Sequence, residues 1–375
     1  MNKITIRFQI KQIFSKNQDS WKIIIMEGNE MNETSYKKKL LLIPSSYNSR
    51  AMGDIEHFIE YYKESFDVYV ISDKYEDKII EEDGVKYVSK KDSLASYLRY
   101  VADYIIDAGS VKGLTKLSKS QKRISVWHGI PYKNMFTKLD PKYCRAALEY
   151  CYGMDLMISP SKFYSEKFLR ESMLYDGEIL ETAMSRTDSL FISEESKNKI
   201  KEELNIPLDK KILLYAPTFR EEGKFKLPFN VKKLKKSLPG DDWVIVTKLH
   251  YLNDLVSKKG IIDCTNYSSI NNLLAISDLL ITDYSSLFFD FSVLNKPIVF
   301  YQYDKEEYES DRGFMFQLED YVDEKYFVHS EDELYSILEN ADSISDNLRR
   351  VKEEFYPMQK ENVTGDLVKQ LNMEK

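Results

Sequence analysis

Short apolar runs alternate with segments of helical periodicity along most of this chain, and this alternation constrains the fold more than any other feature. Leu40–Ile43 and Val68–Ile71 are two such runs. The segment between them, residues 51–64, has an apolar helical face formed by Ile55, Phe58, Ile59 and Tyr62. Strands separated by single helices predict a parallel sheet with helices on both faces. We therefore expect an α/β fold.

The pattern occurs twice, in two halves of comparable length. Further runs that predict strands are 104–107, 124–127, 156–158, 212–215, 243–246, 261–262, 279–281 and 298–301. Helices are predicted at 92–101, 161–172 and 193–204. Because the series restarts near residue 195, we place a boundary at 185–195 and expect two Rossmann-like domains. Ligands of such folds bind at the carboxyl ends of the strands, here in the crevice between the domains.

Both ends of the chain depart from this pattern. Apolar and polar residues alternate through Lys3–Lys11, and Trp21–Ile25 is a second apolar run, so residues 1–30 predict a strand pair. A membrane-facing amphipathic extension is the competing interpretation. Residues 331–375 are charged and helical in pattern, and we expect them to pack back across the first half.

The composition bounds the class of function. With 43% hydrophobic residues, 27 Tyr and 19 Phe, the chain can bury a large core. Its formal net charge of −7 argues against bulk nucleic-acid binding. The three cysteines have no metal-site spacing and are expected to be free thiols in a reducing cytosol. No apolar run approaches the ~20 residues of a membrane span, so we expect a peripheral protein on the cytoplasmic face of the membrane.

Basic residues gather in one segment, 115–142, where Asp140 is the only acidic residue. Such a segment predicts an anion or lipid-headgroup surface, with Met135 and Phe136 as candidates for insertion. A solvated basic surface is the simpler alternative. The basic residues of the segment are Lys116, Lys119, Lys122, Arg123, Lys133, Lys138 and Lys142.

The stretch Ile281–Phe291 combines the end of a buried strand with the start of a helix. Thr282, Asp283 and Tyr284 form the turn, and Ser285 and Ser286 stand where the helix begins. Backbone N–H groups and a positive dipole end then point to one place, which is suited to a phosphate. An ordinary helix cap is the alternative interpretation.

His128 follows the predicted strand 124–127, and Gly129 and Pro131 turn the chain directly after it. Such a position is typical of a side chain that faces a cleft, and an imidazole can accept a proton near neutral pH. A capped turn is the alternative interpretation. Lys133 lies on the same loop. Lys248 and His250 follow another predicted strand and, by alternation, share one side of an extended segment, an arrangement that suits a diphosphate. A solvated strand end is the alternative interpretation.

Three more basic clusters lie beside turns: Tyr215–Arg220, Met184–Asp188 and Arg312–Phe314. The sequence contains no DxD, HExxH, GxSxG, GxGxxG or Walker motif and no paired cysteines. It therefore predicts a basic crevice that requires no cofactor and shows no metal-ligand cluster, with a divalent cation left as an open alternative.

These elements occur in a recognisable order. Trp127–Lys133, Tyr215–Arg220, Lys248–His250, Ile281–Asp290 and Arg312–Phe314 resemble, over roughly residues 40–370, the CDP-glycerol glycerophosphotransferases of teichoic-acid synthesis. The resemblance implies a GT-B-type fold with the active site in the inter-domain cleft. It also implies transfer of glycerol phosphate from CDP-glycerol to a membrane-linked acceptor or growing chain, with release of CMP.

The resemblance also implies roles for individual positions. His128 would be the general base, and Arg312 would lie near the transferred phosphate. Lys248 and His250 would contact the donor nucleotide, and Ser285 and Ser286 would bind its diphosphate. The remaining matched positions are implied as substrate-binding: Lys133, Arg186, Asp188, Thr218, Arg220, Thr282, Asp283 and Asp290.

The resemblance also implies that residues 31–190 bind the acceptor and that residues 191–375 bind CDP-glycerol. The implied partners are CDP-glycerol, an undecaprenyl-type lipid-linked acceptor and an anionic membrane surface. We expect no nucleic acid, and a homo-oligomer is left open. Alternative functions are transfer from CDP-ribitol, a GT-B glycosyltransferase that uses a nucleotide sugar, and a non-catalytic binding protein.

Overall fold

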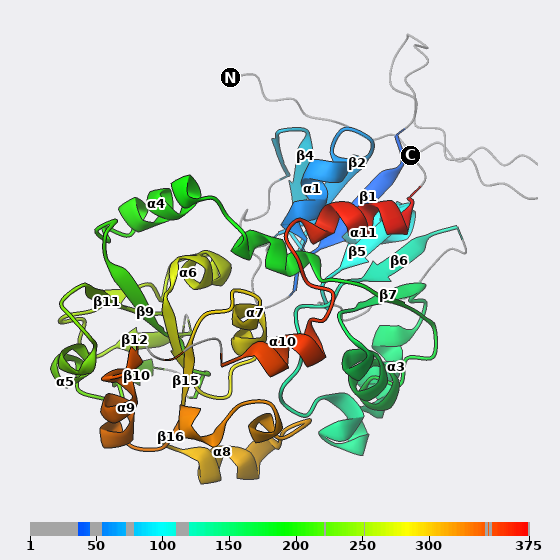
Figure 1. Ribbon diagram of the computed structural model, residues 1–375. Helices are drawn as coiled ribbons and strands as arrows, with labels where there is room; N and C mark the ends of the chain where they lie inside the picture. The colour runs from blue at the N-terminus through cyan, green and yellow to red at the C-terminus, as the bar shows by residue number, and fades with distance from the viewer. Residues whose placement is uncertain are drawn as a thin grey trace, which may run out of the picture. The chain divides into compact units, whose positions relative to one another are not determined.

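A computed structural model describes residues 37–45, 55–72, 79–109, 120–220, 223–250, 252–341, 344 and 347–373. The part of the chain from Lys37 onward forms one compact unit, which contains two largely parallel sheets (Figure 1). Residues 1–30, for which the sequence predicts a strand pair, lie outside the described residues.

The first sheet has the strand order β3-β4-β2-β1-β5-β6-β7-β8. All neighbouring strands are parallel except β3 and β4. Its strands are β1 (Lys39–Ile43), β2 (Asp67–Ile71), β3 (Ile80–Glu82), β4 (Val85–Val88), β5 (Tyr104–Asp107), β6 (Lys122–Ser125), β7 (Leu156–Ser159) and β8 (Glu178–Glu181).

The second sheet has the order β13-β11-β9-β14-β15-β16, and all its neighbouring strands are parallel. Its strands are β9 (Lys211–Tyr215), β11 (Trp243–Thr247), β13 (Ile262–Asp263), β14 (Leu279–Thr282), β15 (Ile298–Tyr301) and β16 (Phe327–Val328). A separate parallel pair joins β10 (Gly223–Phe225) to β12 (Asn253–Leu255). The strand order changes direction between β9 and β14, the kind of point at which α/β folds bind ligands.

Helices connect the strands, as the alternating sequence predicts. The α-helices are α1 (Glu56–Tyr62), α2 (Ser93–Val101), α3 (Cys144–Cys151), α4 (Glu194–Glu203), α5 (Val231–Ser237), α6 (Ile270–Ile276), α7 (Leu287–Ser292), α8 (Lys305–Arg312), α9 (Glu331–Leu338), α10 (Arg349–Phe355) and α11 (Val363–Leu371). Short 3₁₀ turns are η1 (Phe136–Lys138), η2 (Pro141–Tyr143), η4 (Ser185–Leu190), η5 (Leu318–Asp320) and η6 (Glu324–Tyr326), and η3 (Tyr164–Ser172) is π-helical.

Strand β1 shows why its sequence is apolar without interruption. Leu40 and Leu42 point into a core that also contains Phe58 of α1, whereas Leu41 and Ile43 point into a second core on the opposite face. Successive side chains of a strand face opposite sides, so a strand covered on both faces needs an apolar residue at every position. Each such burial stabilises the fold by about 1.5–3 kcal/mol.

The C-terminal helix α11 lies beside α1 on the first sheet (Figure 1). Leu367 of α11 is buried in the same core as Phe58, and the Tyr61 hydroxyl donates to Asn362 Oδ1 at 2.9 Å, just before α11 begins. The end of the chain therefore contributes directly to the core of the first sheet.

Local differences from the predicted elements have clear causes. Strand β6 ends at Ser125 rather than Trp127, because Trp127 adopts a positive φ of 50° that no strand accommodates. The helix predicted at 161–172 winds mostly as π-helix. Strands β3, β4 and β8 are short elements at or next to the edges of the sheet, and the apolar pattern does not reveal them. None of the helices in the described part of the chain has the length and apolarity that crossing a bilayer requires.

Candidate active site

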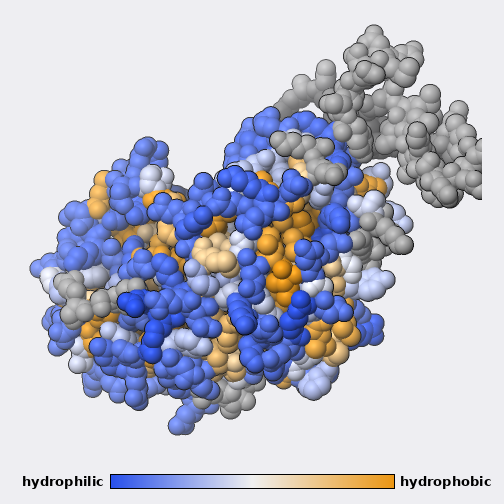
Figure 2. Space-filling model, turned by 45° about the vertical axis from the view of Figure 1, so that its right-hand side comes forward, coloured by the Kyte–Doolittle hydropathy of each residue, from blue (hydrophilic) through white to orange (hydrophobic). Residues whose placement is uncertain are grey.

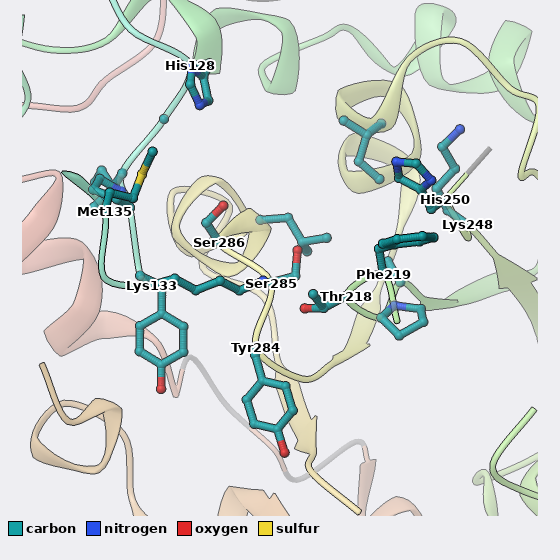
Figure 3. A pocket seen from close by; sticks show the side chains of 18 of the residues that line it. His128, Lys133, Met135, Thr218, Phe219, Lys248, His250, Tyr284, Ser285 and Ser286 are labelled. Carbon is teal, nitrogen blue, oxygen red and sulfur yellow. The ribbon is translucent and has the colours of Figure 1, made fainter. Parts of the chain in front are cut away.

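Four loops that follow strand ends meet around a pocket of about 340 Å³ (Figure 3). They are the segments after β6, β9, β11 and β14, and the pocket lies where the strand order of the second sheet reverses. The sequence-predicted residues that line it are His128, Lys133, Thr218, Lys248, His250, Ser285 and Ser286. The structure thus brings together residues from both halves of the sequence.

His128 is held in a defined orientation above this pocket (Figure 3). Its Nδ1 lies 3.0 Å from the Ala108 carbonyl oxygen, and its ring stacks on Trp127 at a centroid distance of 4.5 Å. A carbonyl can only accept, so Nδ1 carries the hydrogen and the neutral ring has its lone pair on Nε2. That tautomer is the one a general base acting through Nε2 requires.

Ala108 and Gly109, which follow β5, contribute to this orientation and were not among the predicted site residues. Gly109 has a φ of 87°, and a Cβ placed there would lie 2.7 Å from His128 Nδ1 and 2.6 Å from Trp127 Cε3. Only glycine fits both the backbone conformation and the space. The signal in the sequence was a glycine directly after a buried strand.

Ser285 and Ser286 stand between β14 and α7, as predicted. Ser286 occupies the N-cap position of α7 but makes no side-chain capping bond, and it is exposed, whereas Ser285 is half-buried. Helix α7 has six residues and ends at Ser292. Both serines line the pocket, and the Ser286 hydroxyl does so without capping the helix.

Lys248 and His250 both line the pocket, and each makes its own contacts there. The Lys248 ammonium donates to the backbone carbonyls of Thr265 at 2.8 Å and Tyr267 at 2.6 Å. Burial lowers the pKa of Lys248, and the nearby Cys264 and Asp263 oppose this shift. The ring of His250 instead contacts that of Phe219 at a centroid distance of 4.4 Å. Lys248 thus holds the loop after β13 in place through two hydrogen bonds. The rings of His250 and Phe219 together form one side of the pocket.

A second group of predicted residues lies behind the pocket lining. Asp283 accepts hydrogen bonds from the N–H and hydroxyl of Thr218, at 2.8 and 2.7 Å, and from Arg220 at 2.8 Å. Arg220 also pairs with Asp304 at 2.7 Å. The buried Thr282 hydroxyl donates to the Ala216 carbonyl at 2.6 Å. These contacts fix the loops after β9 and β14 relative to each other.

Arg186 and Asp290 form a third group behind the pocket. Arg186 Nη2 lies 2.8 Å from Asp290 Oδ2, and the Tyr356 hydroxyl donates to Asp290 Oδ1 at 2.9 Å. Arg186 also lies against Gly129, where an added Cβ would come within 3.2 Å of its Nη1. Arg186 therefore connects the His128 loop to α7 from behind the pocket.

Asp188 is further from the pocket than the motif comparison implied. Its carboxylate accepts the backbone N–H groups of Val363 and Thr364, both at 2.8 Å, and the Thr364 hydroxyl at 2.6 Å. It caps the N-terminus of α11. Arg312 ends α8, and its side chain lies outside the described part of the structure.

The loop after His128 is also attached to the second sheet. Lys133 pairs with Phe314 in an isolated antiparallel bridge, and the Met315 N–H donates to the Tyr132 carbonyl at 2.9 Å. The buried Tyr132 ring stacks on Phe314 at 4.4 Å. The Lys133 ammonium lies over the Tyr308 ring, 5.0 Å from its centroid. The loop that carries His128 therefore contacts residues from both halves of the chain.

The basic segment 115–142 is not one continuous surface. Arg123 is buried and pairs with Asp107 at 3.1 Å, Met135 lines the pocket, and Phe136 packs on Trp127 and Phe168. Arg123 cannot meet a bilayer as the linear pattern suggested, because it is buried inside the fold. Met135 and Phe136 are half-buried, and their insertion into a bilayer stays a prediction. Lys116 and Lys119 lie outside the described residues.

Within the described ranges, no group of three or more His, Cys, Asp or Glu side chains is arranged to hold a metal ion. The cysteines Cys144, Cys151 and Cys264 are free thiols, as expected.

The chain resembles proteins of teichoic acid synthesis over most of its length. It is 31% identical to a teichoic acid poly(glycerol phosphate) polymerase of Staphylococcus epidermidis, over 75% of this chain and 43% of the polymerase. It is 30% identical to the teichoic acid glycerol-phosphate transferase of Staphylococcus aureus, over 84% of this chain and 85% of the transferase. The structure of the wall teichoic acid polymerase TagF superimposes with a TM-score of 0.76 at 26% identity, over 89% of each chain.

The chain spans 43% of the length of the S. epidermidis polymerase and the same share of a polymerase from Bacillus subtilis. The sequence profile of CDP-Glycerol:Poly(glycerophosphate) glycerophosphotransferases, by contrast, matches residues 30–372. With a match over nearly all of its residues, the chain belongs to the CDP-glycerol:poly(glycerophosphate) glycerophosphotransferase family.

Proposed function

We propose that this protein transfers glycerol phosphate from CDP-glycerol to a hydroxyl of a membrane-linked acceptor or a growing poly(glycerol phosphate) chain, with release of CMP. The observation that carries the proposal is the shared pocket. It places an oriented imidazole, two serine hydroxyls and the basic residues Lys133, Lys248 and His250 around one space.

In this mechanism His128 Nε2 takes the proton of the acceptor hydroxyl as that oxygen attacks the distal phosphorus of CDP-glycerol. A new P–O bond forms, the bond between the distal phosphorus and the bridging oxygen breaks, and its electron pair leaves with CMP. A general base contributes roughly 10²–10⁴-fold to such a step. The rest of the acceleration comes from positioning and charge neutralisation.

The serine pair and the cations supply that neutralisation. The hydroxyls of Ser285 and Ser286 face the pocket and donate to the diphosphate oxygens, and Lys133 approaches the same space along the His128 loop. Arg312, directly before the Gly313 carbonyl that accepts the Asn134 N–H at 3.2 Å, is placed in the proposal near the transferred phosphate. Phe219 and His250 form the side of the pocket that we assign to the nucleotide.

We assign supporting roles to the charged residues behind the lining. Arg220 and Asp283 hold the serine loop, and Arg186 and Asp290 hold the His128 loop against α7. Substitution of these four residues is expected to disturb geometry rather than to remove a substrate contact.

The two sheets correspond in this proposal to the two domains of a GT-B-type arrangement. Residues 31–190 would bind the acceptor and residues 191–375 the donor. The similarity to TagF over most of both chains supports this division, as does the position of the pocket between loops of the two sheets.

A peripheral membrane position is also part of the proposal. Apolar side chains gather in patches on an otherwise hydrophilic face (Figure 2). The consecutive elements η1, η2 and α3 and the turn that follows η3 combine exposed apolar and basic residues. They are Leu139, Tyr143, Leu148, Tyr152 and Leu174, with Lys138, Lys142 and Arg145, which pair with Glu171, Asp140 and Glu149 in turn. Such a mixture suits the headgroup region of an anionic bilayer.

Sedimentation with vesicles containing anionic lipid tests this surface. The double variant Lys138→Glu with Lys142→Glu should bind several-fold less than the native protein. Lys232→Glu with Lys233→Glu, on the exposed side of α5, makes the same charge change elsewhere and should bind normally. Equal binding by all three proteins would contradict the assignment.

A donor panel tests the activity itself. The purified protein is offered CDP-glycerol, CDP-ribitol and several nucleotide sugars with a lipid-linked acceptor, and nucleotide release is measured. CMP release from CDP-glycerol well above that from CDP-ribitol is the expected result. Preference for CDP-ribitol or a nucleotide sugar would replace the proposed donor, and no release from any donor would contradict the proposed activity.

A further inference from the structure

Behind His128 lies a buried polar network that the proposed chemistry does not use. Arg123 and Asp107 are 1% and 0% exposed and form an ion pair at 3.1 Å. Tyr150, also buried, donates its hydroxyl hydrogen to Asp107 Oδ1 at 2.6 Å. Burying charged and polar groups costs free energy unless they are paired, and apolar residues of similar size often stabilise a core as well or better. The cost of burying this network therefore indicates a role other than stabilising the fold.

Its hydrogen bonds have one consistent direction. The Tyr150 hydrogen goes to the carboxylate, which can only accept, so Ser125 Oγ, 2.7 Å from the Tyr150 oxygen, must be the donor in that contact. Ser125 Oγ in turn accepts the backbone N–H of Trp127 at 3.3 Å. Burial and the Asp107 carboxylate raise the pKa of Tyr150, so its hydroxyl keeps the hydrogen that this order requires.

The other end of the network reaches the opposite side of the imidazole. The Gly109 N–H donates to Asp107 Oδ1 at 3.0 Å, the same oxygen that Tyr150 contacts. Gly109 directly follows Ala108, whose carbonyl accepts His128 Nδ1–H. Trp127, at the first end, stacks on the His128 ring. One chain of hydrogen bonds thus joins the two backbone segments that hold the imidazole.

From this geometry we infer that Tyr150, together with Ser125 and Asp107, positions His128. The network fixes the ends of β5 and β6 so that the Ala108 carbonyl keeps the hydrogen on Nδ1 and leaves Nε2 as the basic atom. None of the three touches the pocket, so they act through His128 and are positioning residues rather than catalytic ones. The catalytic part of this inference rests on the proposed function, whereas the effect on the imidazole does not.

Tyr150→Phe is the sharpest test, since it removes one hydroxyl and leaves the ring that packs edge-on against Trp127 at 5.1 Å. Tyr164→Phe is the matched control. Tyr164 is equally buried, in η3, and its hydroxyl has no hydrogen-bond partner among the described residues. Ser125→Ala breaks the same chain at its other end and serves if Tyr150→Phe does not fold.

Two measurements are made on each variant. Long-range ¹H–¹⁵N NMR reports the tautomer of His128, assigned among the four histidines by its absence in His128→Asn. Tyr150→Phe should mix the two tautomers, while Tyr164→Phe and the native protein keep the Nδ1–H form. Turnover with CDP-glycerol should fall about tenfold in Tyr150→Phe, with the Kd for CDP-glycerol within about twofold of native.

The outcomes separate the two ideas. A native tautomer and native turnover in Tyr150→Phe and Ser125→Ala, with only a lower melting temperature, would overturn the inference and leave a purely structural network. If the native protein releases no CMP, the proposed function fails instead, and the tautomer measurement still decides whether the network sets the imidazole.

Discussion

Asp188 caps a helix that begins 175 residues later in the chain: its Oδ2 accepts both the N–H and the hydroxyl of Thr364. Side-chain caps are normally supplied by the residue that precedes the helix, and here that position is held by Asn362, which is in the left-handed region and makes no side-chain cap bond. The junction between the two halves thereby holds the C-terminal helix in place.

Asp188→Ala should loosen α11 rather than weaken donor binding. Loss of an N-cap costs about 1–2 kcal/mol, and three contacts to one carboxylate put this position at the upper end. Hydrogen exchange of α11 amides should accelerate, whereas the Kd for CDP-glycerol stays native. Asp366→Ala, which removes a partly exposed acidic residue of α11 that pairs with Lys360 and Lys369, is the comparison variant and should affect exchange less than Asp188→Ala. A large rise in Kd with unchanged exchange would restore a substrate-binding role for Asp188.

His128→Asn should lower turnover at least 100-fold, the lower range for loss of a general base, while CDP-glycerol binding stays close to native. His329→Asn is a matched control, because His329 also directs Nδ1 to a backbone carbonyl, that of Gln302 at 3.1 Å, yet lies outside the pocket. Single-turnover kinetics and donor titration measure the two effects separately. Near-native turnover in His128→Asn would remove the imidazole from the mechanism.

Gly109→Ala should abolish most activity by displacing both rings beside it. The added Cβ would approach His128 and Trp127 to under 3 Å, in addition to the strain of a positive φ. Gly84→Ala separates the two causes, since Gly84 has a φ of 74° but open space around its Cβ position. We expect Gly84→Ala to lower the stability by about 1 kcal/mol and to leave the activity unchanged. Similar activity in both variants would contradict the close packing at Gly109.

Burial raises the pKa of Cys151 to about 12 and that of Cys264 to about 11. A raised thiol pKa means that the reactive thiolate is scarce at pH 8, roughly 10⁻⁴ and 10⁻³ of each thiol. Alkylation of both by iodoacetamide should be slow in the native protein, rise about tenfold per pH unit, and become fast after denaturation. Mass spectrometry of labelled peptides measures this. Rapid native labelling of either cysteine at pH 8 would show that its surroundings open.

The sequence predicted the central strands well, because β1, β9 and β14 are buried on both faces and their apolar runs are continuous. It also named seven of the residues that line the pocket, and most of these follow such strands closely. The sequence could not distinguish, within one motif, the residues that line the pocket from those that hold the lining in place. Asp283 and Ser285 are two positions apart, yet Asp283 is committed to Thr218 and Arg220, residues more than 60 positions away in the chain.

The same limit applies to charge. Arg123 belongs to a basic run, but its partner Asp107 lies on the neighbouring strand, and only the pairing of β5 with β6 brings them together. Nothing in the sequence distinguished Tyr150, because a tyrosine on an amphipathic helix is usually an ordinary core residue.

The attachment of Tyr132 to Phe314 has a consequence for how the protein would release its product. The imidazole of His128 and the ring of Tyr132 are four positions apart on one loop. At one end of the loop His128 is hydrogen-bonded to Ala108, directly after β5, and at the other end Tyr132 packs against Phe314. If the two sheets moved apart, either Tyr132 would have to leave Phe314 or His128 would have to move away from Ser285 and Ser286. Opening would then switch off proton abstraction at the moment when water could enter.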